Sequence, residues 1–239
     1  MTKFESLFGI KESLVKNTCI LMPLLKKDIL EWLGVKNFSR GRLHGSGNSR
    51  LFTVIHTGLG PALLGDAVLY LKETNCQNII LFGSCGLVKE ESHLGIGSLV
   101  VPSKCYCLEG FTEMLLKDKN NYGAFYPDNA LIENFLTIKK ACDIKKVTCI
   151  TLGSLKLEED YIDTFKEKEI QVVDMECSAL FSASKYIKRA SMAFLYVTDI
   201  INKKPFYMDL KREDRLTLSS SIKASTHILC KFIEENLSS

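Results

Sequence analysis

Short runs of apolar and β-branched residues recur along the chain, and longer amphipathic stretches lie between many of them. The short runs have the length and the flanking residues of buried strands. They predict strands over residues 19–22, 51–56, 79–82, 98–101, 147–152, 170–173 and 193–197. The longer stretches predict helices over residues 24–33, 61–73, 129–141, 161–168, 175–186 and 212–235.

Alternating strands and helices are typical of a sheet that is covered by helices on both faces. The pattern predicts a single three-layer α/β/α domain over residues 1–239, with a central, mostly parallel mixed sheet. Residues 105–126 interrupt the alternation with polar and aromatic residues. A long insertion of this kind in an α/β domain is typical of an active-site wall or a subunit contact.

The composition is that of a globular protein and argues against several classes of partner. Apolar residues make up 46% of the chain, and 31 Lys and Arg stand against 28 Asp and Glu. We expect no nucleic-acid partner, because no dense basic run is present. We expect no membrane partner, because no apolar run approaches the roughly 18 residues that span a bilayer.

The nine cysteines raise the question of disulfides or a metal site. Their number is odd and residues 1–6 do not resemble a secretory signal, so we expect reduced thiols in a cytoplasmic protein. Cys105 and Cys107 form a C-x-C pair without a second pair or a nearby histidine, so we expect no metal.

The first candidate binding segment runs from His56 to Pro61, between a predicted strand and a predicted helix. Gly58 and Gly60 let the backbone turn sharply and let a ligand approach the helix amino terminus. The same glycines also suit a plain strand-to-helix turn. We expect no bound cofactor, because the third glycine of a dinucleotide-binding motif is missing.

The second segment follows the predicted strand 79–82 and places Ser84 and Cys85 between Gly83 and Gly86. Two glycines around a serine make a cradle of backbone N–H groups with one hydroxyl, which suits a phosphate, a water molecule or the edge of a base. A plain turn is the alternative interpretation.

Two further segments place carboxylates at the ends of predicted strands. Asp174, Met175 and Glu176 follow one strand, where a carboxylate can accept hydrogen bonds from both hydroxyls of a ribose and the methionine can lie against the sugar. Asp174 also suits a helix cap. Thr198 and Asp199 follow another strand, where a partly desolvated Asp199 can protonate a leaving base, unless it is a surface loop residue.

In their order and spacing these four segments resemble the nucleoside phosphorylase and nucleosidase superfamily, over residues 19–230. The family includes purine nucleoside and uridine phosphorylases and methylthioadenosine nucleosidases. The resemblance implies that Ser84, Cys85 and Gly86 form its glycine cradle and that Glu176 holds the ribose hydroxyls. It also implies that Asp199 assists the departure of a purine base at N7, and that the chain forms a dimer or hexamer that completes its pocket.

The sequence departs from this family where a phosphate would bind. Leu81 stands where many of the phosphorylases have an arginine, and an apolar side chain cannot replace a guanidinium. Asp28 is the one acidic candidate for the glutamate that positions water in the nucleosidases. Several cations are alternative phosphate ligands: Lys26, Lys27, Arg40, Arg42 and Arg50. Leu81 favours a nucleosidase that acts on a small-molecule nucleoside; a phosphorylase with inorganic phosphate as co-substrate and a non-catalytic nucleoside-binding protein are the alternatives.

Overall fold

The computed structural model describes residues 1–117, 123–137 and 143–237. Its strands are β1 Thr18–Met22, β2 Phe38–Arg40, β3 Gly45–Asn48, β4 Phe52–His56, β5 Asn78–Leu87, β6 Leu99–Leu108, β7 Ala124–Phe125, β8 Ile144–Leu152, β9 Val172–Asp174 and β10 Ala190–Ile200. Its helices are α1 Lys3–Phe8, α2 Lys27–Trp32, α3 Pro61–Tyr70, α4 Gly110–Leu116, α5 Asn129–Leu136, α6 Ile162–Glu167, α7 Cys177–Tyr186 and α8 Arg212–Asn236. Short 3₁₀-helices include Leu155–Tyr161, directly before α6.

The strands form one mixed sheet whose longest parallel ladders run through β5 and β8. β5 pairs in parallel with β1 and β10. β10 also pairs antiparallel with β6. β6 pairs in parallel with β8, and β8 pairs in parallel with β9. Because β9 pairs antiparallel with β5, the pairings return to β5 and close a ring of strands. The mixed sheet confirms the prediction from the sequence, which does not include this closure.

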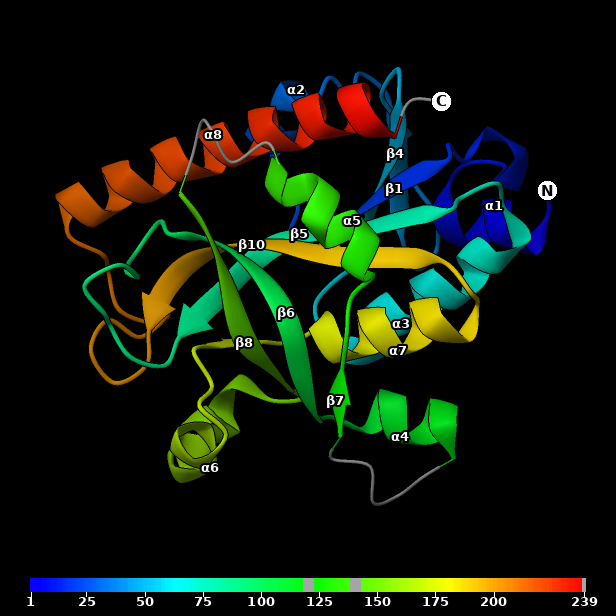
Figure 1. Cartoon of the computed structure of the whole chain (residues 1–239). Coiled ribbons are helices and arrows are strands. Elements are labelled where there is room, and N and C mark those ends of the chain that lie inside the picture. The colour runs from blue at the N-terminus through cyan, green and yellow to red at the C-terminus, as the bar shows by residue number, and fades with distance from the viewer. Residues whose placement is uncertain (118–122, 138–142, 238–239) are drawn as a thin grey trace.

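Helices cover the sheet on two faces, as the three-layer prediction requires (Figure 1). α2, α5 and α8 pack on one face around a buried cluster that contains Phe135 and Phe232. α3, α4 and α7 pack on the other face around a second cluster that contains Leu64 and Leu180. Full burial of a large apolar side chain contributes roughly 1.5–3 kcal/mol, so the two clusters fix the helices firmly against the strands.

Short elements near the amino terminus lack the periodicity on which the sequence prediction depends. α1 spans six residues: Thr2 caps it by accepting a hydrogen bond from the Glu5 amide at 3.1 Å, and Phe4 stacks on Phe8 at 4.2 Å. β2 and β3 form an antiparallel pair, and β3 contains no apolar side chain. A Cβ on Gly47 would lie 2.5 Å from a neighbouring carbonyl oxygen, so close backbone packing selects glycine there.

Two strands continue beyond the ends that their apolar runs predict, which corrects the position of two candidate segments. β5 carries Ser84, Cys85 and Gly86 within the strand and not in a turn after it. β10 likewise carries Thr198 and Asp199. The continued residues of β5 and β10 pair with each other, so ladder hydrogen bonds extend both strands past the apolar pattern.

The segment 105–126 and the predicted helix 129–141 also differ from expectation. β6 includes Cys105 and Cys107, so the segment begins as a sheet strand and continues into α4 and β7, while residues 118–122 lie outside the described residues. α5 ends at Leu136, and residues 138–141 of the predicted helix also lie outside the described residues.

Two expectations from composition concern membranes and cysteines. Among the described helices, none combines the length and the apolar character that crossing a bilayer requires. Each of the described cysteines is a free thiol, and all but Cys230 are buried.

Candidate active site

Strand β5 brings the candidate segments together at Gly86. This residue pairs with Asp199 of β10 on one side and with Val173 of β9 on the other. β9 ends at Asp174, and Glu176 follows as the amino-terminal cap residue of α7. The acidic segment and the second aspartate therefore flank the cradle near the carboxyl end of β5, and α/β sheets commonly bind ligands at the carboxyl ends of their parallel strands.

Asp199 is held in a buried position beside an irregularity in β10. The register shifts between Val197 and Asp199, which makes Thr198 an extra residue of the kind that forms a β-bulge and re-aims side chains. The Thr198 hydroxyl donates a hydrogen bond to Asp199 Oδ1 at 2.7 Å. Asp199 is 8% exposed, and burial raises the pKa of its carboxyl, while the hydrogen bond from Thr198 opposes the rise.

A second carboxyl, which the sequence interpretation does not include, lies beside Asp199. Glu158 comes from the 3₁₀-helix before α6 and is 7% exposed. A Cβ placed on Gly86 would lie 2.9 Å from Asp199 Oδ2 and 3.4 Å from Glu158 Oε1, so both carboxyls approach the same point. Burial, and then the negative charge of Asp199, raise the pKa of Glu158 to about 7. Glu158 belongs to the acidic run 158–160, and such a run is typical of solvent-exposed surface.

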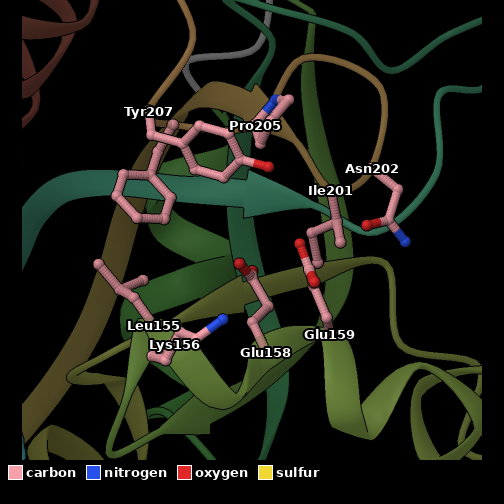
Figure 2. A pocket seen from close by; sticks show the side chains of 9 residues that line it. Leu155, Lys156, Glu158, Glu159, Ile201, Asn202, Pro205 and Tyr207 are labelled. Carbon is pink, nitrogen blue, oxygen red and sulfur yellow. The ribbon is translucent and has the colours of Figure 1, made fainter.

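A cavity of about 540 Å³ opens beside Glu158, between the 3₁₀-helix and the loop that follows β10. Leu155 lines it from the helix, and Pro205 and Tyr207 line it from the loop; Figure 2 shows the latter two across the cavity from Leu155 and Glu158. Cavities of several hundred cubic ångströms hold small organic ligands. Within the described residues Asp199 does not line the cavity itself, so Glu158 connects the cavity with the Asp199 carboxyl.

Glu176 lies against the loop that the sequence singles out between β4 and α3. Its Oε1 accepts a hydrogen bond from the Gly60 amide at 2.7 Å. Gly58 and Gly60 have φ values of 82° and 101°, a left-handed conformation that residues with a Cβ rarely adopt. Glu176 is 5% exposed, and burial, followed by the negative charge of Asp174, raises its pKa to about 8.

The hydrogen bonds of Asp174 support the capping interpretation of this residue. Its Oδ1 accepts from the Thr151 hydroxyl at 2.6 Å and from the Cys149 thiol at 3.5 Å. Its Oδ2 accepts from the amides of Glu176 at 3.0 Å and Cys177 at 2.6 Å. Both carboxyl oxygens are thus engaged at the start of α7, where they fix the segment that carries Glu176.

The other predicted binding residues are buried to different extents. Ser84 and Met175 are half-buried, and so is Thr198. Cys85 is buried, its thiol packs in the core on the α3 and α7 side, and burial raises the pKa of that thiol. Its carbonyl oxygen lies 3.3 Å from the Thr198 hydroxyl.

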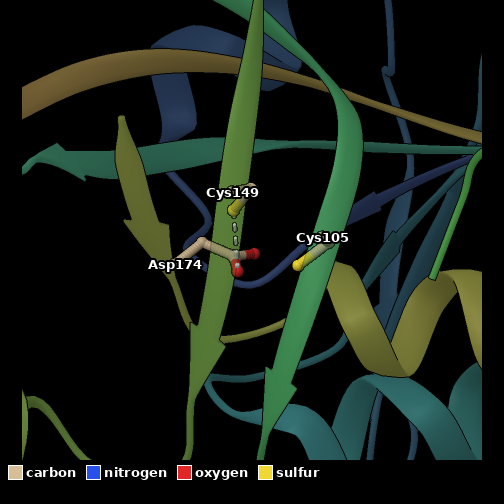
Figure 3. Close-up of side chains that lie close together, drawn as sticks. All are labelled: Cys105, Cys149 and Asp174. Atoms are coloured by element: carbon tan, nitrogen blue, oxygen red, sulfur yellow. Dashed lines mark hydrogen bonds between the residues drawn. The ribbon is translucent and has the colours of Figure 1, made fainter. Parts of the chain in front are cut away.

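One group of potential metal ligands is present among the described residues, formed by Cys105, Cys149 and Asp174 (Figure 3). Their ligand atoms lie within 4.8 Å of one another, and all three residues are buried. The carboxyl of Asp174 already has a donor at each oxygen, and the Cys105 sulfur lies 3.2 Å from the Thr151 hydroxyl. These contacts make the group a hydrogen-bonded core network around the α7 cap, and the expectation of no metal stays a prediction.

The residues that bear on phosphate binding lie in several places. Leu81 is 1% exposed and packs in the core on the α3 and α7 side, where it presents no cation. Lys26, Asp28 and Arg215 line a separate cavity of about 200 Å³ between α2 and α8. Arg50 forms an exposed ion pair with Glu234 at the carboxyl-terminal part of α8.

Comparisons with known proteins agree with the fold. Residues 27–234 match the model of the phosphorylase superfamily. The fold is similar to uridine phosphorylase from Vibrio fischeri ES114 (TM-score 0.77, 18% identity, 95% of each chain covered). It is also similar to AMP nucleosidase from Bacteroides thetaiotaomicron (TM-score 0.74, 18% identity, 99% of this chain and 96% of that chain). A third similar structure is the 5′-methylthioadenosine/S-adenosyl homocysteine nucleosidase of Campylobacter jejuni (TM-score 0.72, 15% identity, 92% of this chain and 99% of that chain).

A search of curated proteins finds no match to this chain. The family model nevertheless spans most of the chain, and it confirms the resemblance that the four sequence segments indicate. The chain belongs to the phosphorylase superfamily.

Proposed function

We propose that this protein cleaves the N-glycosidic bond of a purine nucleoside. The observation that carries the proposal is the arrangement around Gly86, which pairs with Asp199 on one side and with the strand leading to Glu176 on the other. Both carboxyls are nearly buried, and both have a raised pKa. The names of the similar structures, a nucleoside phosphorylase and two nucleosidases, support the same bond as the target.

The two carboxyls suit the two demands of this reaction. Cleavage passes through a transition state with positive charge on the sugar, and the departing base must be stabilised as its bond to ribose breaks. Asp199, whose pKa is raised by burial, assists the base as a general acid at N7. The Gly60 amide already fixes the Glu176 carboxyl, which forms hydrogen bonds with the ribose hydroxyls.

Water is the nucleophile that we favour. The side chain of Leu81 lies in the core, so this strand position offers no cation for a phosphate. Phosphorolysis with phosphate held by Lys26 or another cation is the alternative, in keeping with the likeness to a uridine phosphorylase. We further propose that the protein acts as a homo-oligomer in the cytoplasm, without a bound cofactor.

The purified protein is incubated with adenosine, inosine, uridine and methylthioadenosine, with and without phosphate, and the free base is measured. Release regardless of phosphate supports hydrolysis, release only with phosphate supports phosphorolysis, and no release from any of them contradicts the proposal. Asp199→Asn is expected to lower turnover by roughly 100-fold or more, since general acid catalysis contributes about that much. Asp163→Asn is the control, because Asp163 is exposed on α6; equal turnover in the two variants removes Asp199 from the mechanism.

A further inference from the structure

Two nearly buried carboxyls from different elements approach one point on β5. Glu158 Oε1 and Asp199 Oδ2 both lie within 3.5 Å of the position that a Cβ on Gly86 would take. Within the described part of the chain, neither carboxyl forms an ion pair. Glu158 also lines the cavity of about 540 Å³, so the pair lies at the boundary between strand β5 and that cavity.

We infer that Glu158 and Asp199 hold one proton between them and together recognise the edge of a 6-aminopurine, with Glu158 selecting adenosine-type over inosine-type substrates. This inference rests on the proposed function, and it adds to it the class of base and the residue that selects it.

A single proton on the pair follows from its position. Both carboxyls are nearly buried and approach the same point, so two negative charges there would repel each other and one carboxyl keeps its proton. Burial raises the pKa of both carboxyls, and the charge of Asp199 adds to the rise at Glu158, whose pKa is about 7. The pair therefore offers one O–H donor and one carboxylate acceptor.

This combination matches one type of purine edge. Adenine presents the N7 acceptor next to the donor N–H groups of its 6-amino group, whereas a 6-oxopurine presents two acceptors, N7 and O6. When an aminopurine binds, Asp199 carries the proton and donates to N7, while the carboxylate of Glu158 accepts from the 6-amino group. With a 6-oxopurine the carboxylate faces a lone pair and stays without a partner, which is costly in a buried site.

The same pair supplies the proton that the reaction needs. The bond from the sugar carbon C1′ to base N9 breaks, its electron pair stays with the base, and N7 takes the proton of the pair. Water adds its oxygen to C1′, and its released proton returns to the carboxyls. Charge and atoms balance without any further reactant.

The test compares kcat/KM for adenosine and inosine in the wild type, Glu158→Gln and Glu167→Gln. We expect the wild type to prefer adenosine by roughly tenfold or more, as one well-placed base contact discriminates. Glu158→Gln is expected to abolish or reverse this preference, because its amide can donate to O6. Glu167 is exposed on α6, so Glu167→Gln is the matched control and is expected to keep the wild-type ratio.

If the protein cleaves neither adenosine nor inosine, the inference can still be tested by binding. Calorimetry then measures the affinity for free adenine and for free hypoxanthine. Absence of cleavage would contradict the proposed function, whereas tighter binding of adenine that is lost in Glu158→Gln would still support the inference. A wild type that prefers inosine or hypoxanthine would overturn it. So would a Glu158→Gln variant that keeps the wild-type preference.

Discussion

Replacing Gly86 by alanine tests whether the position of the Asp199 carboxyl matters for turnover. The new Cβ would lie 2.9 Å from Asp199 Oδ2, which is closer than carbon and oxygen atoms can approach without displacement. The contact to Glu158 Oε1 would be 3.4 Å, at the edge of an ordinary contact. Gly86 lies in an extended strand, so the backbone accepts alanine and the carboxyl of Asp199 has to move.

The size of the effect follows from this distance. To restore an ordinary contact of 3.4 Å the Asp199 oxygen must withdraw by about 0.5 Å. A misplacement of 1 Å at a reacting group costs on the order of 100-fold in rate, so we expect Gly86→Ala to lower kcat about tenfold. The free energy of unfolding should stay within about 1 kcal/mol of the wild type, because glycine itself is unfavourable in a strand.

The assay measures kcat on the preferred nucleoside together with urea unfolding for wild type, Gly86→Ala and Gly95→Ala. Gly95 is a matched control, since its new Cβ would meet the nearest atom, Glu90 Oε1, at 3.8 Å. We expect full turnover in Gly95→Ala. Full turnover in a folded Gly86→Ala would refute the placement of the carboxyl at the reacting base.

Two further predictions concern stability. Asp174→Ala removes the cap of α7 and the acceptor of Thr151, and it should lower the free energy of unfolding by about 1–3 kcal/mol in urea titrations; a loss no greater than that of Asp163→Ala would contradict the cap. Glu176 has a pKa of about 8 in the folded protein against 4.5 for an unperturbed glutamate, so the folded state keeps a proton that the unfolded state loses. Wild type should therefore lose stability relative to Glu176→Gln as pH rises from about 4.5 to 8, and a constant difference between their urea midpoints over this range would contradict the burial effect.

The sequence predicts the main strands, the long helices and three of the carboxyls around the site, because these features depend on local patterns. Runs of apolar and β-branched residues predict strands such as β1 and β8 from the local sequence alone. It cannot predict that β9 turns back to pair with β5, since that contact joins Val173 to Gly86 across a large part of the chain.

Glu158 shows the same limit within the site. Its neighbours in sequence are acidic, and an acidic run is ordinarily solvated. Its burial arises from the 3₁₀-helix that carries it over the end of β5, next to the one residue without a side chain at that point. Only the pairing of distant strands places Gly86 beside the two carboxyls, because a glycine in isolation is equally consistent with a turn.

The closed ring of strands has a consequence for how relatives of this chain diverge. Each strand of the ring is paired along both sides, so a slip in register would break two ladders at once. Fewer than one residue in five is identical to the uridine phosphorylase of Vibrio fischeri, yet the backbones superpose over 95% of both chains. The ring thus holds the backbone beneath the candidate site in one register, whereas the connecting segments that carry Glu158 and Tyr207 lie outside its ladders.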